Sequence, residues 1–186
     1  MKQPKVYFRD AQPEDVSFIF NSWLKSYRNA KAVSHVPSSI YYTEHHKVLE
    51  KILKTCNVTI ASNPMDKSQI YGYVVFEKID GFNVFHYAYT KHPFRKMGIM
   101  NALVRTVHRD PSVGCLYTHD TAIGSRIAPK YNGVYHPYLA LTPDYRSLDV
   151  DEIIEEIEQE YSDVEGSSES DRSVESEKTA QESEQE

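Results

Sequence analysis

The order of strand and helix patterns constrains the fold of this chain more than any other feature of the sequence. Between residues 6 and 141, runs with a period near two alternate with runs of helical period, and turn residues separate them. Strands are predicted over 6–9, 57–62, 69–79, 83–91, 113–118 and 134–141, and helices over 12–27, 43–55, 95–109 and 122–131. This order predicts an α/β (α+β) fold with a mixed, mostly antiparallel central sheet of about six to seven strands flanked by helices.

Local signals set the expected ends of these elements. Thr43 is the expected N-cap of the second helix, because its hydroxyl can accept from a free N–H of the first turn. Asp80-Gly81-Phe82 lies between two strand patterns and predicts a hairpin. The residues expected to face inward are Val48, Leu49, Ile52 and Leu53 in the second helix and Ile99, Leu103, Val104 and Val107 in the third.

Charge is distributed unevenly along the chain. Residues 149–186 contain 16 acidic and two basic side chains, whereas residues 1–148 contain 19 basic and 11 acidic ones. The formal charge of −6 is therefore the sum of a +8 body and a −14 segment. We expect one domain over 1–148, a short acidic helix over 149–162, and a disordered tail rich in Ser and Glu over 163–186, since that tail has almost no apolar side chains. The acidic segment is a candidate for docking a protein partner.

Several classes of protein are excluded. No stretch approaches the ~18 apolar residues that a membrane-spanning helix needs, and the N-terminus has no apolar core of a signal peptide. Two cysteines form no disulfide framework, which favours a reducing, cytoplasmic setting. We expect no metal site, because His45-His46 point apart on a helix and Cys115 with His119 is only a pair. The signatures of P-loop, zincin and α/β-hydrolase enzymes are missing.

The most informative segment joins the strand pattern 83–91 to the helix pattern that follows it. A proline at 93 ends the strand, and Arg95 and Lys96 precede Gly98 at the expected start of the helix. Free N–H groups at a helix N-terminus attract anions, and a glycine allows a ligand to approach the backbone closely. This segment therefore predicts a phosphate or pyrophosphate site.

The same segment resembles the acyl-coenzyme-A signature of the GCN5-related N-acetyltransferase (GNAT) superfamily. That signature, Arg/Gln-x-x-Gly-x-Gly/Ala, is matched by Arg95-Lys96-Met97-Gly98-Ile99-Met100, except that Met100 replaces a small residue. The order of elements over 6–141 is also similar to that of the superfamily. A weaker resemblance, in residues 18–28, is to phage-encoded members.

The resemblance implies where acetyl-coenzyme A, the expected co-substrate, would bind. The pantetheine arm would lie along the end of strand 83–91, at Tyr89 and Thr90. The pyrophosphate would be held by the segment from Arg95 to Met100, which comprises Arg95, Lys96, Met97, Gly98, Ile99 and Met100. The long side chain of Met100 could narrow that pocket or point away from it.

Two further groups are needed for acetyl transfer. A base must take a proton from the amine; strand 83–91 has no carboxylate, which leaves His86 on that strand or Glu77 on the preceding one. The resemblance implies a tyrosine that protonates the leaving thiolate. Tyr131 is the candidate, and Tyr135 stays open because the spacing around Gly133 is short. Structural roles for these tyrosines and for His86 remain alternatives.

The sequence predicts an acyl-CoA-dependent N-acetyltransferase that transfers acetyl to an amine by direct attack. The alternative is a catalytically degenerate GNAT-like binding protein that uses its acidic tail for a partner. Nucleic-acid binding by the +8 body is a third, weaker hypothesis, since no recognition motif accompanies the charge. The acceptor amine cannot be inferred from the sequence, although residues 28–45 and 120–135 are expected to shape its site.

Overall fold

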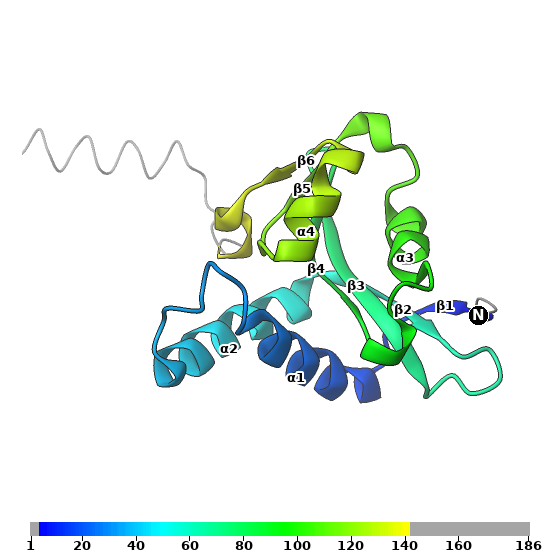
Figure 1. Ribbon diagram of the computed structural model, residues 1–186, viewed down its shortest axis with the longest axis horizontal. Helices are drawn as coiled ribbons and strands as arrows, with labels where there is room; N and C mark the ends of the chain where they lie inside the picture. Colours follow the sequence, from blue (N-terminus) through cyan, green and yellow to red (C-terminus); the bar gives the residue numbers. More distant parts are fainter. Residues whose placement is uncertain (1–3, 142–186) are drawn as a thin grey trace, which may run out of the picture. The chain divides into compact units, whose positions relative to one another are not determined.

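The computed structural model describes residues 4–141 of the chain. A six-stranded sheet in the order β1-β2-β3-β4-β5-β6 forms its centre (Figure 1). The strands are β1 (Tyr7–Asp10), β2 (Asn57–Ser62), β3 (Ile70–Ile79), β4 (Phe82–Thr90), β5 (Cys115–Tyr117) and β6 (Gly133–Tyr135). Strands β1 to β4 pair antiparallel, whereas β5 pairs parallel with both β4 and β6. The predicted fold class, a mixed and mostly antiparallel sheet flanked by helices, is confirmed.

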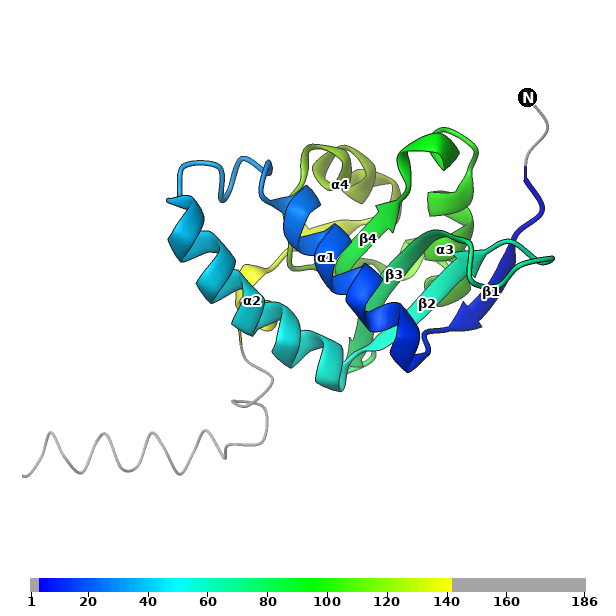
Figure 2. The ribbon, with the colours of Figure 1, turned by 90° about the horizontal axis from the view of Figure 1, so that it is seen from below.

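The helices cover both faces of the sheet. Residues 4–141 contain four α-helices: α1 (Val16–Tyr27), α2 (Ser38–Thr55), α3 (Ile99–Val107) and α4 (Ala122–Ile127). Helices α1 and α2 pack side by side on one face, and α3 packs against β2, β3 and β4 on the other (Figure 2). Short 3-10 helices at Pro13–Asp15, His92–Phe94, Pro111–Val113, Ala128–Tyr131 and Pro137–Ala140 complete the connections.

Each face of the sheet has its own hydrophobic core. The larger core joins α1 and α2 to the sheet through Trp23, Leu49 and Tyr73, all fully buried. The smaller core lies under α3, where Ile99 and Leu103 pack on Val74. The side chains predicted to face inward from α2 and α3 all do so in part or in full, except that Val104 belongs to neither core.

The β3–β4 hairpin forms at the predicted place, and it contains an irregularity that matters for the site. Asp80 and Gly81 both have positive φ angles, of 50° and 86°, as a two-residue hairpin turn of the primed type requires. Further along, Val75 pairs with Tyr87 whereas Phe76 pairs with Phe85, so His86 is an extra residue on β4. This β-bulge turns His86 toward the α1–α2 face, where Tyr87 also lies.

Several predicted element boundaries are wrong, and in three cases a proline or a glycine sets the observed one. Helix α2 begins at Ser38 rather than Thr43, because Pro37 ends the preceding loop with an extended ψ of 139° and takes the N-cap position. Helix α3 begins at Ile99 rather than Arg95, since Gly98 has a left-handed φ of 80°. The last strand spans only Gly133–Tyr135, because Pro137 removes a backbone donor and starts a 3-10 helix.

The predictions for 149–162 and 163–186 fall outside the described residues. Within residues 4–141, no helix is both long enough and apolar enough to cross a membrane.

Candidate functional site

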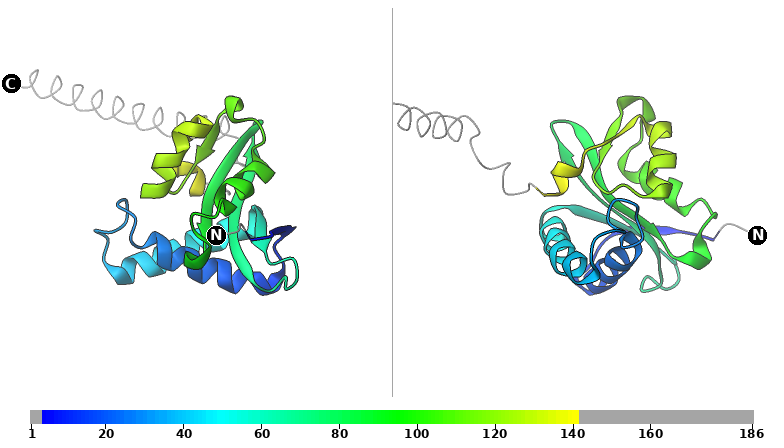
Figure 3. Two further views of the ribbon diagram at one scale, coloured as in Figure 1. Left: turned by 45° about the vertical axis from the view of Figure 1, so that its right-hand side comes forward. Right: turned by 60° about the vertical axis from the view of Figure 1, so that its left-hand side comes forward.

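The sheet opens between β4 and β5, and this opening places the candidate site (Figure 3). The two strands pair only from Asn83 to Phe85, and the last backbone hydrogen bond runs from Thr118 N–H to Phe85 O at 3.1 Å. Beyond that point β4 continues to Thr90 with no partner on its β5 side within the described residues. We call the end of the pairing, at Phe85 and Thr118, the apex of the opening.

The free edge of β4 offers hydrogen-bonding groups. Lys91 N–H donates to Tyr71 O on β3 at 2.8 Å. Because successive residues of a strand direct their amide groups to opposite sides, Thr90 and Ala88 direct theirs into the opening. The hydroxyl of Thr90 is also buried and has no hydrogen-bond partner in the part of the chain that the structure describes. This edge can therefore bind an extended ligand that carries amide groups.

The chain after β4 forms the turn that the sequence predicted as a phosphate site. Lys96 and Gly98 both have left-handed φ angles, of 64° and 80°, and α3 follows at Ile99 without a side-chain cap. None of the N–H groups from Lys96 to Met100 takes part in a backbone hydrogen bond among the described residues. A left-handed turn in front of a helix N-terminus concentrates such N–H groups and favours a bound anion.

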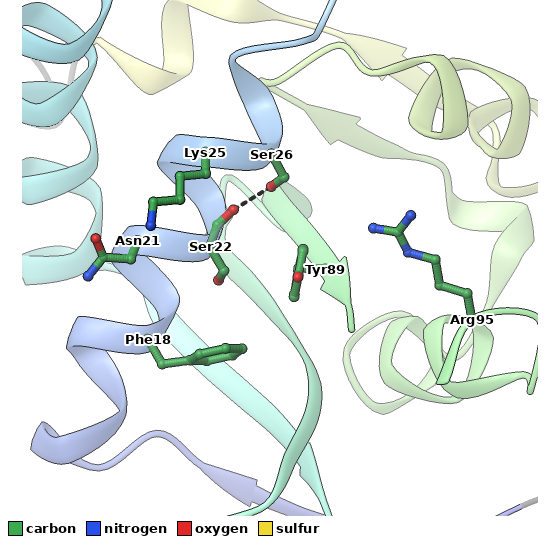
Figure 4. Close-up of a pocket in the computed structure, with 7 residues that line it drawn as sticks. All are labelled: Phe18, Asn21, Ser22, Lys25, Ser26, Tyr89 and Arg95. Atoms are coloured by element: carbon green, nitrogen blue, oxygen red, sulfur yellow. Dashed lines mark hydrogen bonds between the residues drawn. The ribbon is translucent and has the colours of Figure 1, made fainter. Parts of the chain in front are cut away.

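Arg95 connects this turn to the end of β4. Its Nε donates to the carbonyl oxygen of Thr90 at 3.1 Å, so the guanidinium is held over the strand end. Figure 4 shows this guanidinium directed toward Tyr89, across a cleft whose other wall is α1. The cleft has a volume of about 420 Å³ and is lined by Phe18, Asn21, Ser22, Lys25, Ser26, Tyr89 and Arg95.

The cleft is basic. Lys25 and Arg95 line it, and the Nζ atom of Lys91 lies 4.5 Å from the centre of the Phe18 ring. No carboxylate is among the lining residues that the structure describes. Two serines of α1 fix its wall, because Ser22 Oγ lies 2.9 Å from Tyr73 OH and Ser26 Oγ lies 2.8 Å from Tyr87 OH. Both hydroxyl pairs tie α1 to the sheet beside the opening.

The position of the free edge depends on a glycine in β3. A Cβ atom added to Gly72 would lie 2.4 Å from Tyr89 O and 3.2 Å from Thr90 Cα. Only glycine allows β4 to approach β3 this closely.

The two candidate bases, His86 and Glu77, are brought together by the bulge. His86 Nε2 lies 2.8 Å from Glu77 Oε1, and His86 Nδ1 lies 3.1 Å from Thr118 Oγ1. The side chain of His86 is 1% exposed and that of Glu77 is 14% exposed. Because both ring nitrogens of His86 are occupied, Glu77 is the member of the pair that a solvent-borne group can reach.

The polar chain continues from His86 across the apex. Thr118 Oγ1 also lies 2.8 Å from His119 Nδ1, so Glu77, His86, Thr118 and His119 form one hydrogen-bonded chain. Burial holds the pKa of His119 well below 6.5, and burial also lowers the pKa of His45 to about 4. Both rings are therefore neutral near pH 7, beside the aromatic rings of Tyr27 and Trp23.

The two candidate proton donors lie in different places. The ring of Tyr131 is 6.0 Å from that of His108, whose Nδ1 lies 3.0 Å from Asn83, at the closed end of the β4–β5 pairing. Tyr135 instead pairs with Tyr117, the partner of Phe85 at the apex. Burial first, and then the charge of Asp120, raises the pKa of Tyr135, which keeps its hydroxyl protonated. The structure thus brings Tyr135, and not Tyr131, to the level of the apex.

Of the remaining predicted cofactor residues, two pack in the core, whereas the other two line the cleft or are partly exposed. Ile99 is buried under α3, and Met97 packs on the same core. Tyr89 stacks on Tyr73 with 5.5 Å between ring centres and lines the cleft. Met100 is the second residue of α3 and is partly exposed.

Sequence reasoning missed Thr118 as a member of the site. It considered His119 only as a possible metal ligand with Cys115, whereas the Cys115 thiol is directed to Tyr131 O at 3.7 Å. The available signal was a Thr-His pair directly after a short strand. This pair does not indicate a site until the β4–β5 register shows that it lies beside His86.

Comparison with known proteins gives similarity in structure only. No family model and no curated protein matches the sequence. A Pyrococcus furiosus protein provisionally named as an acetyl transferase is 16% identical, with a TM-score of 0.45 over 71% of this chain and 82% of that one. A GNAT-family acetyltransferase from Brucella melitensis, solved with acetyl-CoA, is 15% identical, with a TM-score of 0.43 over 66% of this chain and 81% of that one.

A third neighbour is an N-acetyltransferase from Thermoplasma acidophilum, solved in complex with coenzyme A. It is 11% identical, with a TM-score of 0.41 over 56% of this chain and 70% of that one. Several other acetyltransferase structures are covered over 64% to 67% of their length. Because all these TM-scores lie below 0.5, we transfer no residue role from them.

Proposed function

We propose that this chain is an acyl-CoA-dependent N-acetyltransferase of the GNAT superfamily, with its catalytic domain in residues 1–148. One observation carries the proposal: the free edge of β4 leads directly into a left-handed, basic turn whose N–H groups have no backbone partner among residues 4–141. Acetyl-coenzyme A has an arm with amide groups and a pyrophosphate. A free strand edge suits the amide groups, and a basic turn with N–H groups suits the pyrophosphate.

Each part of the co-substrate has a matching group on the protein. The amide groups of Ala88 and Thr90 would pair with the pantetheine arm, and the Thr90 hydroxyl supplies a further partner. The N–H groups from Lys96 to Met100 would bind the pyrophosphate, with Arg95 adding positive charge. These contacts would bring the thioester near the apex.

The reaction forms a C–N bond and breaks a C–S bond, so one proton leaves the amine and one joins the thiolate. Glu77, held by His86, is the proposed acceptor of the amine proton. Tyr135 is the proposed donor to the thiolate, in preference to Tyr131, because it lies at the level of the apex. A backbone N–H of β4 would polarise the thioester carbonyl.

Binding of acetyl-coenzyme A to the full-length protein tests the proposal. We expect saturable binding in calorimetry, with stabilisation of about 2.7 kcal/mol at a ligand concentration one hundred times Kd. Arg95→Gln should weaken binding about tenfold or more, because a charged hydrogen bond is lost. Arg126→Gln, which removes an exposed charge on α4, is the matched control and should bind like the wild type. Absence of binding at millimolar ligand would refute the proposal.

A second candidate function is a GNAT-like binding protein without turnover. It is favoured by the burial of His86, whose two nitrogens are both hydrogen-bonded, and by the lack of a carboxylate on β4. The acidic segment 149–186 would then serve a protein partner. An assay for free coenzyme A distinguishes the enzyme from the binding protein. A thiol reagent would follow its release over a panel of amines and lysine peptides. Binding without any amine-dependent release would favour this second function.

A further inference from the structure

We propose that Cys56, Glu77 and His86 form a binding site for a zinc ion. The thiol sulfur, a carboxylate oxygen and a ring nitrogen of these residues all lie within 4.8 Å of one another. This inference goes beyond acetyl transfer and does not depend on it; while zinc is bound, the Glu77 carboxylate is a ligand and does not act as the proton acceptor proposed above.

The topology of the sheet brings the three residues together. Cys56 ends α2 and precedes β2; since Asn57 pairs with Phe76, Cys56 lies beside Glu77 on β3. The β-bulge then turns His86 of β4 toward the same face. Three separate elements thus each direct one donor group to one point, so the cluster does not result from closeness in the sequence.

The donor set matches zinc in type and in charge. Thiolate and imidazole ligands favour zinc over magnesium or calcium, which prefer oxygen. A thiolate, a carboxylate and a neutral imidazole balance the +2 charge, which reduces the cost of burying the ion. Three protein ligands with water in the fourth place is the arrangement of an open zinc site.

The geometry requires only a small adjustment. Tetrahedral zinc, with bonds of about 2.0 Å to nitrogen and 2.3 Å to sulfur, separates its ligand atoms by about 3.5 Å. The carboxylate and imidazole atoms now lie 2.8 Å apart and would open slightly, and the thiol sulfur already lies within 4.8 Å of both. Cys56 and Glu77 are both partly exposed, so an ion can reach the site from solvent.

The outer hydrogen bonds also suit a metal ligand. In one arrangement of the chain, His86 Nδ1–H donates to Thr118 Oγ1, and the Thr118 hydroxyl donates to His119 Nδ1. His86 Nε2 then presents its lone pair to Glu77, and two such acceptors need a proton or a cation between them. Histidine ligands in metal sites are commonly held through their other nitrogen in this way.

Cobalt spectroscopy tests the site directly. Full-length protein without a histidine tag, freed of metal with a chelator, is titrated with Co²⁺ as a spectroscopic substitute for Zn²⁺. We expect a thiolate-to-cobalt absorption band at one equivalent, abolished by Cys56→Ser and retained in Cys115→Ser. A spectrum without that band, or one that both variants leave unchanged, would overturn the proposal, because weak binding by the acidic segment involves no thiolate.

Calorimetry with Zn²⁺ tests the outer hydrogen bond. Thr118→Val should weaken zinc binding about tenfold, whereas Thr118→Ser, which keeps the hydroxyl, should bind like the wild type. Thermal unfolding without metal shows whether each variant is folded. Equal zinc affinity of folded Thr118→Val and wild type would show that the ring is not held for a metal, and would count against the site.

Discussion

Replacement of Gly72 by alanine tests whether the β3–β4 approach sets the position of the binding edge. The new Cβ would lie 2.4 Å from Tyr89 O, whereas ordinary contacts begin at 3.4 Å. The end of β4 would therefore have to retreat by about 1 Å, because the obstructing atom belongs to the backbone and not to the far end of a flexible side chain. Overpacking of this kind costs about 1–3 kcal/mol of unfolding free energy.

The displacement also moves the groups that are proposed to bind the co-substrate. Thr90, whose Cα would lie 3.2 Å from the new atom, carries both the free edge and the carbonyl that holds Arg95. We therefore expect Gly72→Ala to lower the urea midpoint and to weaken acetyl-coenzyme A binding, both measured on the same protein.

Gly81→Asn is the control for loss of a glycine in the same hairpin. Gly81 has a positive φ of 86° but no atom within 4 Å of an added Cβ, and asparagine tolerates this conformation. It should change stability little and binding not at all. If Gly72→Ala unfolds at the wild-type urea concentration and binds acetyl-coenzyme A equally well, the close approach does not position the site.

Three further predictions concern protons. Tyr135→Phe should lower the rate of acetyl transfer more than Tyr131→Phe, with little effect on acetyl-coenzyme A binding; an equal or reversed effect in a steady-state assay would contradict the placement at the apex. His45, whose pKa is lowered from 6.5 to about 4 by burial, must stay neutral, so stability falls as pH drops from 6.5 toward 4; His45→Phe, which also removes a buried nitrogen without a partner among the described residues, should reduce that fall in denaturant titrations. The hydrogen bond from Arg9 lowers the pKa of Asp15 below its usual 3.8. The wild type should therefore lose stability as the pH falls below that value, and Asp15→Asn should lose less over the same titration.

The parts of the fold that follow from local chemistry were predictable. Strand β2 has the predicted bounds, and the Asp80-Gly81 turn forms where two residues tolerate positive φ. The start of α2 was not predictable in this way. Thr43 has the side chain of an N-cap residue, but Pro37 takes the N-cap position, and the helix begins five residues before Thr43. Helix starts of this kind depend on which of several local signals the tertiary structure uses.

The candidate site was likewise predictable only in part. The basic turn before α3 could be recognised from Arg95, Lys96 and Gly98, since they are neighbours in the sequence. The chain from Glu77 through His86 to Thr118 could not, because it requires a bulge in β4 and the register of a parallel pair. Periodicity reports which face of a strand is buried, but it carries no information on where two strands separate.

The polar chain at the apex lies where the opening starts. The last backbone bond between β4 and β5 ends at Phe85 O, and the His86–Thr118 hydrogen bond follows immediately, between side chains. A buried polar chain is costly unless all its members are paired, and here each member is. The same chain of four side chains connects Glu77 to the apex, so we expect a change at Thr118 to alter both the free edge of β4 and the position of Glu77.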